Sequence, residues 1–355
     1  MALVLQILIV AAAGVAAIAP MSPVWIERVY SRGLYLDLQA WLTPATNAIP
    51  VAVLDVAGLV TGVCLLAVVT VRLVLASGWR LFALLRLVWQ AFVIGAVGYL
   101  VFLAMWGLNY RREPLASKLE FDQRRVTQHA LSTLAAGSVD QLNMLYRAAS
   151  AAPGWPPLDG MVNSLGPAFE KAQRRLQARV AVPGEPKWSL LTLYFEHAAV
   201  DGMTDPFFLE ILVRHDLLPF ERPFVVAHEW AHLAGYAEES EANFMGWLTC
   251  MEGRARAKYS GWIFLYGQVA SDLSQPDRMR LAQRLEPGPR ADLQSLYDKY
   301  QRQTLPIARD ASRVVYDRFL KANRVGAGIE SYDAVVRLIL GTEFRGKFVP
   351  VIRAR

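Results

Sequence analysis

Three long apolar runs dominate the first 108 residues of the chain. The runs cover about residues 3–19, 53–75 and 87–108. Each approaches the roughly 20 apolar residues that a membrane-spanning helix needs. Trp89 and Trp106 lie near the ends of the third run, where interfacial aromatic side chains are common. We therefore predict a membrane region, residues 1–108, with three transmembrane helices.

The first run could be a signal peptide or an uncleaved helix, and the segment after it is rich in aromatic residues. Residues 3–19 have the apolar length of a signal peptide, but no basic residue precedes them and Pro20 and Pro23 follow. We therefore expect an uncleaved helix. The aromatic-rich segment 25–47 is expected to be a partly helical loop that lies at the membrane interface.

Residues 109–355 have the charge density and the periodicity of a globular domain. Apolar positions recur with helical spacing over residues 121–150 and 162–180, and helical patterns dominate the C-terminal part. The expected fold class is therefore a membrane α-helical N-terminal region plus an α+β, mostly helical, gluzincin-like metallopeptidase domain. The gluzincin-like part of this expectation rests on the motifs described below.

Two short segments in this domain have the composition of β-strands. Residues 189–195 and 207–213 are rich in apolar and β-forming side chains, and Asp201 and Gly202 indicate a turn between them. The second segment is a candidate edge strand along which an extended peptide could lie. A strand inside the sheet would have the same pattern.

Composition and charge agree with a chain that is part membrane and part globular. Of the 355 residues, 54% are hydrophobic and 19% are charged. Soluble proteins have about 25% charged residues. Much of the net charge of +6 lies beside the apolar runs, where it can contact lipid headgroups. No basic stripe with interleaved aromatic residues marks a nucleic-acid surface, so the lipid bilayer is the expected partner and nucleic acid is not.

The informative motif runs from His228 to His232 and lies between Pro223 and Gly235. Proline suits the first turn of a helix and glycine suits its end, so the motif is predicted to be helical. Residues four apart share one helix face, which lets His228 and His232 hold one Zn²⁺ ion. Glu229 would lie beside the metal as the general base. This arrangement is the HExxH motif of zinc peptidases.

A zinc site needs a third protein ligand, and three carboxylates follow the motif. Glu239 is the expected ligand, and Asn243, one turn later, could orient a ligand histidine through a hydrogen bond. Glu238 is the alternative ligand if Gly235 turns the chain as in HExxHxxGxxE sites. Glu241 is expected to support the site without binding the metal.

The stretch Glu239-Ser-Glu-Ala-Asn243 resembles the ExxA[DN] signature that follows HExxH in several zinc peptidases. These are membrane peptidases of the HtpX and CAAX-prenyl-peptidase type and the ImmA-type proteases. In those families the first glutamate of the signature is the third zinc ligand, which corresponds to Glu239. The resemblance implies a gluzincin-like domain with Zn²⁺ as its cofactor.

A second resemblance extends over nearly the whole chain. The matching stretches are residues 30–35, 106–110, 228–244, 259–261 and 319–323. They resemble a family of bacterial three-span membrane proteins of unknown function. This resemblance implies a place in the bacterial inner (cytoplasmic) membrane and gives no substrate.

The leading prediction is a membrane-anchored zinc-dependent peptidase that hydrolyses a peptide or protein substrate with metal-activated water. Tyr259, beyond the motif, is the candidate residue for stabilising the transition state. The alternative is a non-catalytic membrane scaffold or sensor with a structural zinc site. A transporter is disfavoured, because the apolar runs contain almost no ionisable residue.

The orientation in the membrane is predicted from the basic residues between the spans. The connection between the second and third runs is short and basic, with Arg72, Arg80 and Arg86, which favours its retention in the cytoplasm. The opposite orientation is favoured by Arg28 and Arg32 in the first loop together with Arg111, Arg112 and Lys118 after the third run. The resembling family implies the first arrangement, so we expect an extracytoplasmic catalytic domain.

Overall fold

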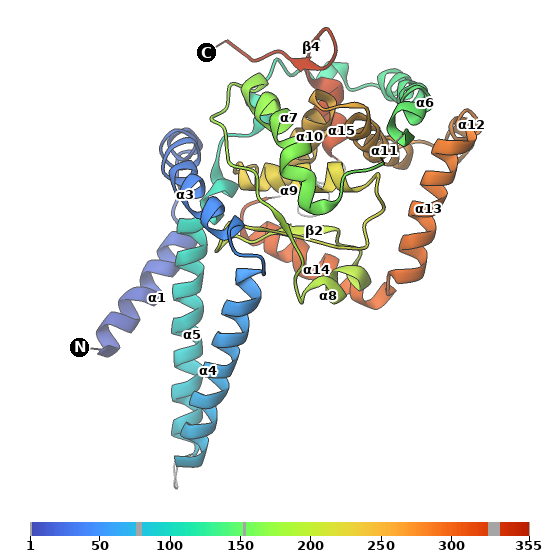
Figure 1. The fold of residues 1–355 in the computed structure, drawn as a ribbon. Helices are drawn as coiled ribbons and strands as arrows, with labels where there is room; N and C mark the ends of the chain where they lie inside the picture. The colour runs from blue at the N-terminus through green and yellow to red at the C-terminus, as the bar shows by residue number, and fades with distance from the viewer. Residues whose placement is uncertain (1, 76–79, 152–153, 326–333, 355) are drawn as a thin grey trace.

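The computed structural model of the protein describes residues 2–75, 80–151, 154–325 and 334–354. Within this part of the chain helices dominate, and the strands form one three-stranded and one two-stranded sheet. Figure 1 shows a helical domain with long helices that project from one of its sides. The prediction of a mostly helical chain is confirmed. The division at residue 108 stays a prediction, and the main core also includes Ile26, Tyr30 and Leu36.

Two helices are long and apolar enough to cross a membrane. They are α4 (Val53–Leu75) and α5 (Arg80–Met105), with apolar windows at Val53–Arg72 and Leu84–Met105. None of the α4 window and 17% of the α5 window is buried within the protein, as expected for helices surrounded by lipid. Helix α1 (Ala2–Ile18) qualifies only together with Pro23–Asn47, across a bend of 105°. The chain therefore has two or three candidate spans, where three were predicted.

The third predicted span, residues 87–108, ends earlier than expected. Helix α5 stops at Met105, and Gly107–Arg111 form a 3-10 turn, η2. The chain leaves the helix at Trp106, which is buried in the domain and whose indole Nε1 donates to the carbonyl of His232 at 3.0 Å. The apolar pattern did not predict this end, because a buried tryptophan and a lipid-facing one are equally apolar.

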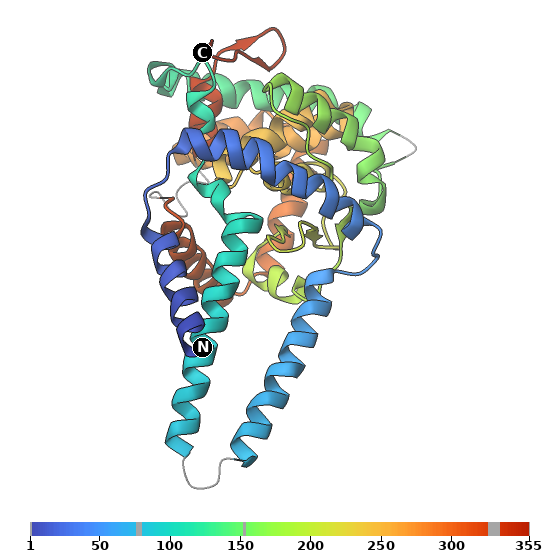
Figure 2. The same cartoon turned by 90° about the vertical axis from the view of Figure 1, so that its left-hand side faces the viewer.

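The aromatic-rich segment after α1, expected as a partly helical interfacial loop, is helical from Pro23 to Asn47, and its place at the membrane interface stays a prediction. It consists of α2 (Pro23–Trp25), a π-helical segment η1 (Ile26–Leu34) and α3 (Tyr35–Asn47). The Tyr35 side chain is buried, and its hydroxyl donates to the carbonyl of Leu233 at 2.8 Å. The segment therefore packs across the domain, as the blue helix of Figure 2 shows.

The three-stranded sheet has the order β1–β3–β2. Its strands are β1 (Pro186–Lys187), β2 (Gly202–Thr204) and β3 (Ile211–Val213). The central strand β3 pairs parallel with β1 and antiparallel with β2, with Met203 opposite Leu212. Of the two alternatives left open for residues 207–213, the structure therefore has the strand inside the sheet, at Ile211–Val213. The turn expected at Asp201 and Gly202 is instead the start of β2.

Residues 189–195, expected as a strand, lead into a helix. Helix α8 covers Thr192–Ala198. A turn precedes it, in which the Ser189 hydroxyl accepts the N–H of Leu191 at 3.1 Å and donates to Asp55 at 2.8 Å. A short apolar run has no clear period, so the sequence did not separate strand from helix.

The remaining helices, with α9 and α10 at their centre, form the body of the domain (Figure 1). They are α6 (Gln128–Ser150), α7 (Met161–Arg175), α9 (Arg222–Leu233), α10 (Glu239–Glu252), α11 (Ala255–Ser271), α12 (Gln275–Gln283), α13 (Pro287–Gln303), α14 (Pro306–Ala322) and α15 (Ala334–Gly341), with 3-10 turns η3 (Leu115–Ser117), η4 (Gln123–Arg125) and η5 (Leu158–Gly160) and the hairpin strands β4 (Phe344–Arg345) and β5 (Val349–Pro350). Helix α10 is buried along nearly its whole length. Helix α6 starts later than predicted because Thr127 caps it, accepting the N–H of Ala130 at 3.1 Å. Helix α7 ends at Arg175 and not at residue 180.

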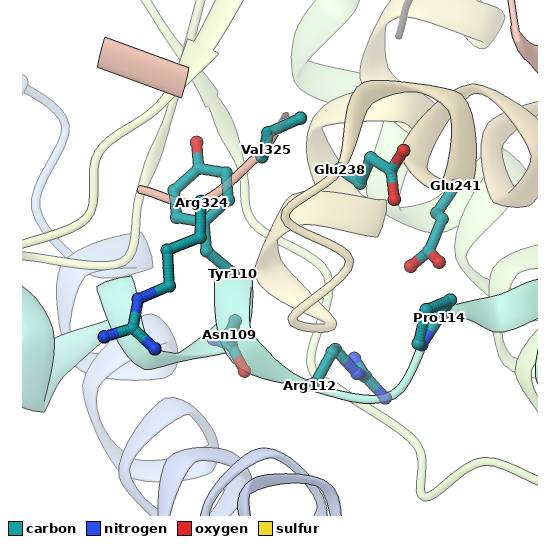
Figure 3. Close-up of a pocket in the computed structure, with 8 residues that line it drawn as sticks. All are labelled: Asn109, Tyr110, Arg112, Pro114, Glu238, Glu241, Arg324 and Val325. Carbon is teal, nitrogen blue, oxygen red and sulfur yellow. The ribbon is translucent and has the colours of Figure 1, made fainter. Parts of the chain in front are cut away.

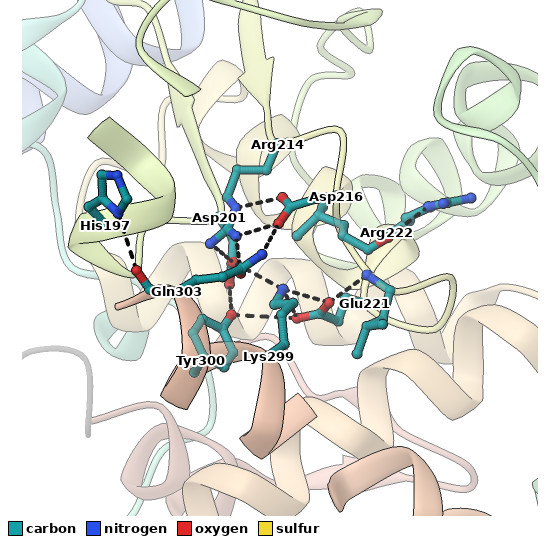
Figure 4. Close-up of polar contacts among 11 residues, drawn as sticks. His197, Asp201, Arg214, Asp216, Glu221, Arg222, Lys299, Tyr300 and Gln303 are labelled. Atoms are coloured by element: carbon teal, nitrogen blue, oxygen red, sulfur yellow. Dashed lines mark hydrogen bonds and ion pairs between the residues drawn. The ribbon is translucent and has the colours of Figure 1, made fainter. Parts of the chain in front are cut away.

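A buried polar network fixes the start of α9 against α13 (Figure 4). The ammonium group of Lys299 on α13 donates to both carboxylate oxygens of Glu221, at 2.7 and 2.8 Å, and Glu221 directly precedes α9. Beside this pair, the guanidinium of Arg214 contacts Asp216 at 2.7 and 2.8 Å and donates to Gln303 at 2.6 Å. Charges this deeply buried depend on their partners for compensation.

We expect Lys299→Met to destabilise the protein by about 3–5 kcal/mol, because the Glu221 carboxylate would stay buried without its cation. The measurement is chemical unfolding of the full chain in detergent. The matched control, Glu221→Gln combined with Lys299→Met, removes both charges and should recover much of the loss. Unchanged stability of the single variant would show that this pair does not hold α9 in place.

Candidate metal centre

The motif helix α9 begins and ends where its sequence predicts. Pro223 lies in its first turn, and Gly235 follows its end with a φ of +81°, a conformation that favours glycine. The N–H groups of Gly235 and Tyr236 donate to carbonyls of the last turn at 2.9 and 3.1 Å, so the chain reverses sharply. This reversal lets α10 begin at Glu239 and pack against α9.

The structure brings His228, His232 and Glu239 together. The Nε2 atoms of the two histidines are 3.1 Å apart. The Oε2 atom of Glu239 lies 3.3 Å from Nε2 of His228 and 3.7 Å from Nε2 of His232. The side chains of His228, His232 and Glu239 are 14%, 9% and 3% exposed. The three residues therefore form a mostly buried group, with their potential ligand atoms within 4.8 Å of one another.

The donor atoms of this group fit a metal ion. The Oε2 atom of Glu239 is buried and accepts no hydrogen bond from the described residues, although it faces two imidazole nitrogens. A cation among these atoms would compensate the buried carboxylate. Two imidazoles and a carboxylate are a common donor set for Zn²⁺, and imidazole also binds copper, iron and nickel.

The charges of the group shift one another's pKa values. Burial lowers the pKa of His232, but the carboxylates of Glu239 and Glu229 and the Tyr236 carbonyl together outweigh burial and raise that pKa to about 9. Burial likewise raises the pKa of Glu239, and the two histidines outweigh it and hold the pKa well below its usual range. Both shifts follow from the attraction between the buried carboxylate and the imidazoles beside it.

Two hydrogen bonds orient His232. Its Nδ1 atom lies 2.7 Å from the carbonyl oxygen of Tyr236, so in the neutral imidazole Nδ1 carries the proton and Nε2 presents its lone pair to the group. The carbonyl of His232 accepts the indole N–H of Trp106 at 3.0 Å. The imidazole is therefore fixed in the tautomer that can bind a metal through Nε2.

Glu229 lies on α9 beside the two histidines and is not one of the three donor residues. Its buried carboxylate accepts a hydrogen bond from the Thr204 hydroxyl on β2 at 2.9 Å. β2 comes this close because Gly202 has no side chain, and a Cβ there would lie 2.9 Å from Oε1 of Glu229. Burial raises the pKa of Glu229, which suits a group that takes up a proton.

Sequence reasoning missed three side chains around the group, those of Thr204, Tyr316 and Tyr110. The Tyr316 hydroxyl on α14 donates to Oε1 of Glu239. Burial, and then the nearby Glu239 carboxylate, raise the pKa of Tyr110. The stretch 106–110 stood out in the sequence only through a family resemblance, and nothing marked Tyr316 or Thr204.

Glu238 and Glu241 line a separate pocket of about 210 Å³ together with Arg112 (Figure 3). The Glu241 carboxylate accepts the backbone N–H of Leu115. Burial, followed by repulsion from Glu238, raises the pKa of Glu241 to about 7. Neither residue belongs to the donor group, so the structure brings Glu239, and not Glu238, to the two histidines.

Two other candidates are not placed as the sequence suggested. The amide nitrogen of Asn243 and the Nδ1 atom of His228 are both buried and have no hydrogen-bond partner among the described residues, so the structure does not join Asn243 to a ligand histidine. Tyr259 is buried on α11, its hydroxyl donates to Asp292 at 2.7 Å and its ring lies against Tyr146. This position gives Tyr259 no contact with the donor group.

Comparisons with known proteins identify a family for this chain but no activity. No curated protein and no solved structure matches the chain. A family model described as "Protein of unknown function (DUF3810)" matches residues 30–340. This range contains the whole donor group and the helices that carry it. The chain therefore belongs to the DUF3810 family.

Proposed function

We propose that this protein is a membrane-anchored zinc-dependent peptidase. The observation that carries the proposal is the convergence of His228, His232 and Glu239 beside a second buried carboxylate, Glu229, that lies outside the donor set. Two imidazoles and one carboxylate are typical of catalytic zinc sites, which keep the fourth position for water or substrate. Structural zinc sites usually fill all four positions with protein ligands.

The residues of the site have separate roles in this proposal. His228, His232 and Glu239 would hold the ion, which when bound supplies Lewis acidity and lets water ionise near neutral pH. Glu229 takes a proton from the attacking water and passes it to the leaving amine nitrogen. The Thr204 hydroxyl keeps the Glu229 carboxylate in position.

The position of the third donor residue, Glu239, after the HExxH motif supports a gluzincin-like site. In the families that the sequence resembles, the third ligand is the first glutamate of the signature that follows HExxH. Glu239 is the first residue of α10. The connection from α9 is short, and the reversal at Gly235 is sharp enough to bring Glu239 to within 3.3 Å of His228.

The position of β2 supports a peptide as the substrate. β2 lies at an edge of the three-stranded sheet, and its Thr204 contacts Glu229. An extended peptide that added to this edge would place its backbone beside the general base. This proposal gives β2 the role that the sequence suggested for residues 207–213.

One observation favours the second candidate, a membrane scaffold or sensor with a structural metal site. The donor group is mostly buried, and the hydroxyl of Tyr316 on α14 donates to Glu239, so α14 covers one side of it. In that case Glu229 would have no chemical role. Variants of Glu229 therefore separate the two candidates.

We also propose that the protein lies in a bacterial cytoplasmic membrane with its catalytic domain outside. Two or three candidate spans support the membrane location. The sequence that joins α4 to α5 is basic, with Arg72 before it and Arg80 and Arg86 after it, which favours the cytoplasmic side. Because only α4 and α5 flank this connection, the orientation is the same whether or not α1 crosses the membrane.

The first prediction from the site is its metal content. The full chain purified in detergent should contain about one zinc ion per chain. His228→Ala should lose the zinc, because only two donors remain. Glu238→Ala is the control and should keep the zinc, since Glu238 lies outside the donor group. Elemental analysis makes the measurement, and a folded wild-type chain without metal would contradict both candidate functions.

The second prediction separates catalysis from metal binding. Glu229→Gln should retain zinc and lower peptide hydrolysis by about 10²–10⁴-fold, because it removes the proton acceptor and no ligand. Glu239→Gln should weaken zinc binding instead. Fluorogenic peptide libraries and zinc content provide the two readouts. Hydrolysis that survives in Glu229→Gln would exclude the assigned mechanism, and zinc loss on Glu238→Ala alone would make Glu238 the third ligand.

The third prediction concerns orientation. Alkaline phosphatase fused after residue 355 should be active in bacterial cells, because this enzyme folds only outside the cytoplasm. A green fluorescent protein exported by the same route should be dark at the same position. The opposite pattern would place the domain in the cytoplasm.

A further inference from the structure

The exposed apolar side chains of the domain are concentrated on α8 and α14. Beyond residue 108, most of the large apolar side chains that are exposed in the described part of the chain belong to residues 188–194 and 305–319, which we call the α8–α14 surface. Leu193, Ile307 and Val315 are 68%, 87% and 67% exposed. The exceptions elsewhere are Met144, Met279 and Tyr297. Such a concentration marks a surface that binds something apolar.

The α8 side of this surface is joined to the start of α4. Asp55, in the first turn of α4, accepts the Ser189 hydroxyl and the N–H of Leu190, both at 2.8 Å. The apolar window of α4 begins at Val53, and none of it is buried within the protein. The residues around Leu190 therefore lie at the level where α4 enters the lipid.

The α14 side is joined to the ends of the other two apolar helices. The ring of Phe319 lies 5.9 Å from that of Phe102, near the end of α5. Arg324, just after α14, donates to the carbonyls of Ala17 and Ala19 at the end of α1, at 3.0 and 2.8 Å. Helices α8 and α14 pack together on the side from which α4 and α5 project (Figures 1 and 2).

The two faces of α14 differ as they do in helices that lie on membranes. Ile307, Val314 and Val315 share one face and are exposed, whereas Leu320 is buried and Tyr316 contacts the donor group. Basic residues outnumber acidic residues along α14, which favours anionic lipid headgroups.

We propose that the α8–α14 surface binds the same lipid bilayer that α4 and α5 cross, with its apolar side chains between the headgroups and the acyl chains. Lipid around α4 and α5 already extends to the ends of these helices, where α8 and α14 are attached. A second copy of the chain that covered this surface would also meet the lipid at the attached ends of α4 and α5. The proposal does not depend on whether the metal group is catalytic.

Membrane binding by this surface places the donor group close to the bilayer. Tyr316 lies on α14, and its hydroxyl donates to Glu239, so one side chain separates the membrane-bound helix from a donor residue. On the proposed peptidase function, the substrates would be peptide segments close to a membrane anchor. This last step fails if the protein is no peptidase, whereas the surface would still bind lipid.

The test uses single nitroxide labels on the full chain in vesicles of phosphatidylethanolamine and phosphatidylglycerol. Cys64 is replaced by serine, and the buried Cys250 is retained. Ile307→Cys, Val315→Cys and Leu193→Cys report on the surface. Met144→Cys and Met279→Cys are matched controls, because these side chains are also apolar and exposed, on α6 and α12. The Cys64→Ser chain without an added cysteine must take up no label.

Electron paramagnetic resonance then compares collisions with oxygen, which concentrates in lipid, and with a water-soluble nickel chelate. We expect the ratio of oxygen to nickel collisions at positions 307, 315 and 193 to exceed that at the two control positions several-fold. Equal ratios at all five positions would show that the surface faces water. Low nickel access accompanied by spin–spin broadening, lost on dilution with unlabelled chain, would show that a second copy covers it. Either result overturns the proposal.

Discussion

The buried carboxylate of Glu239 is the constraint on which the rest of the site depends. A carboxylate that is 3% exposed needs compensation from cations or hydrogen-bond donors. His228 and His232 face one of its oxygens, and the Tyr316 hydroxyl donates to the other. The carbonyl of Tyr236 fixes the tautomer of His232. The sharp end of α9 and the packing of α10 against it hold these side chains at contact distance.

The parts of the site that lie on one helix could be predicted from the sequence, and the parts that come from distant elements could not. The spacing of His228 and His232 and the helix ends beside them are local properties, which a pattern expresses directly. Glu239 was favoured over Glu238 by its spacing from Asn243 and by a resemblance. Thr204 and Tyr316 reach the group from β2 and α14, and only tertiary packing brings them there.

In the fold as well, elements with a clear local pattern could be predicted, and features that depend on tertiary packing could not. Helices α4 and α5 were expected because an uncharged run of about 20 residues is rare outside membrane-spanning helices. Residues 189–195 were misassigned because a short apolar run fits a strand and a helix equally well. The stretches 106–110 and 319–323, distant in sequence, meet beside the donor group, where the rings of Tyr110 and Phe319 are 5.9 Å apart. Two stretches that resemble the same family thus contact each other in the structure, and neither stretch reveals this contact alone.

The donor group and the candidate membrane spans are connected by single side chains. Helix α5 ends at Met105, and the next residue, Trp106, donates to the carbonyl of His232. Helix α14 contacts α5 through Phe319 and Glu239 through Tyr316. Connections this short fix the distance between the group and the ends of the spans. On the proposed function, this distance would select substrates in addition to their sequence, since only peptide bonds at a suitable distance from the bilayer could reach Glu229.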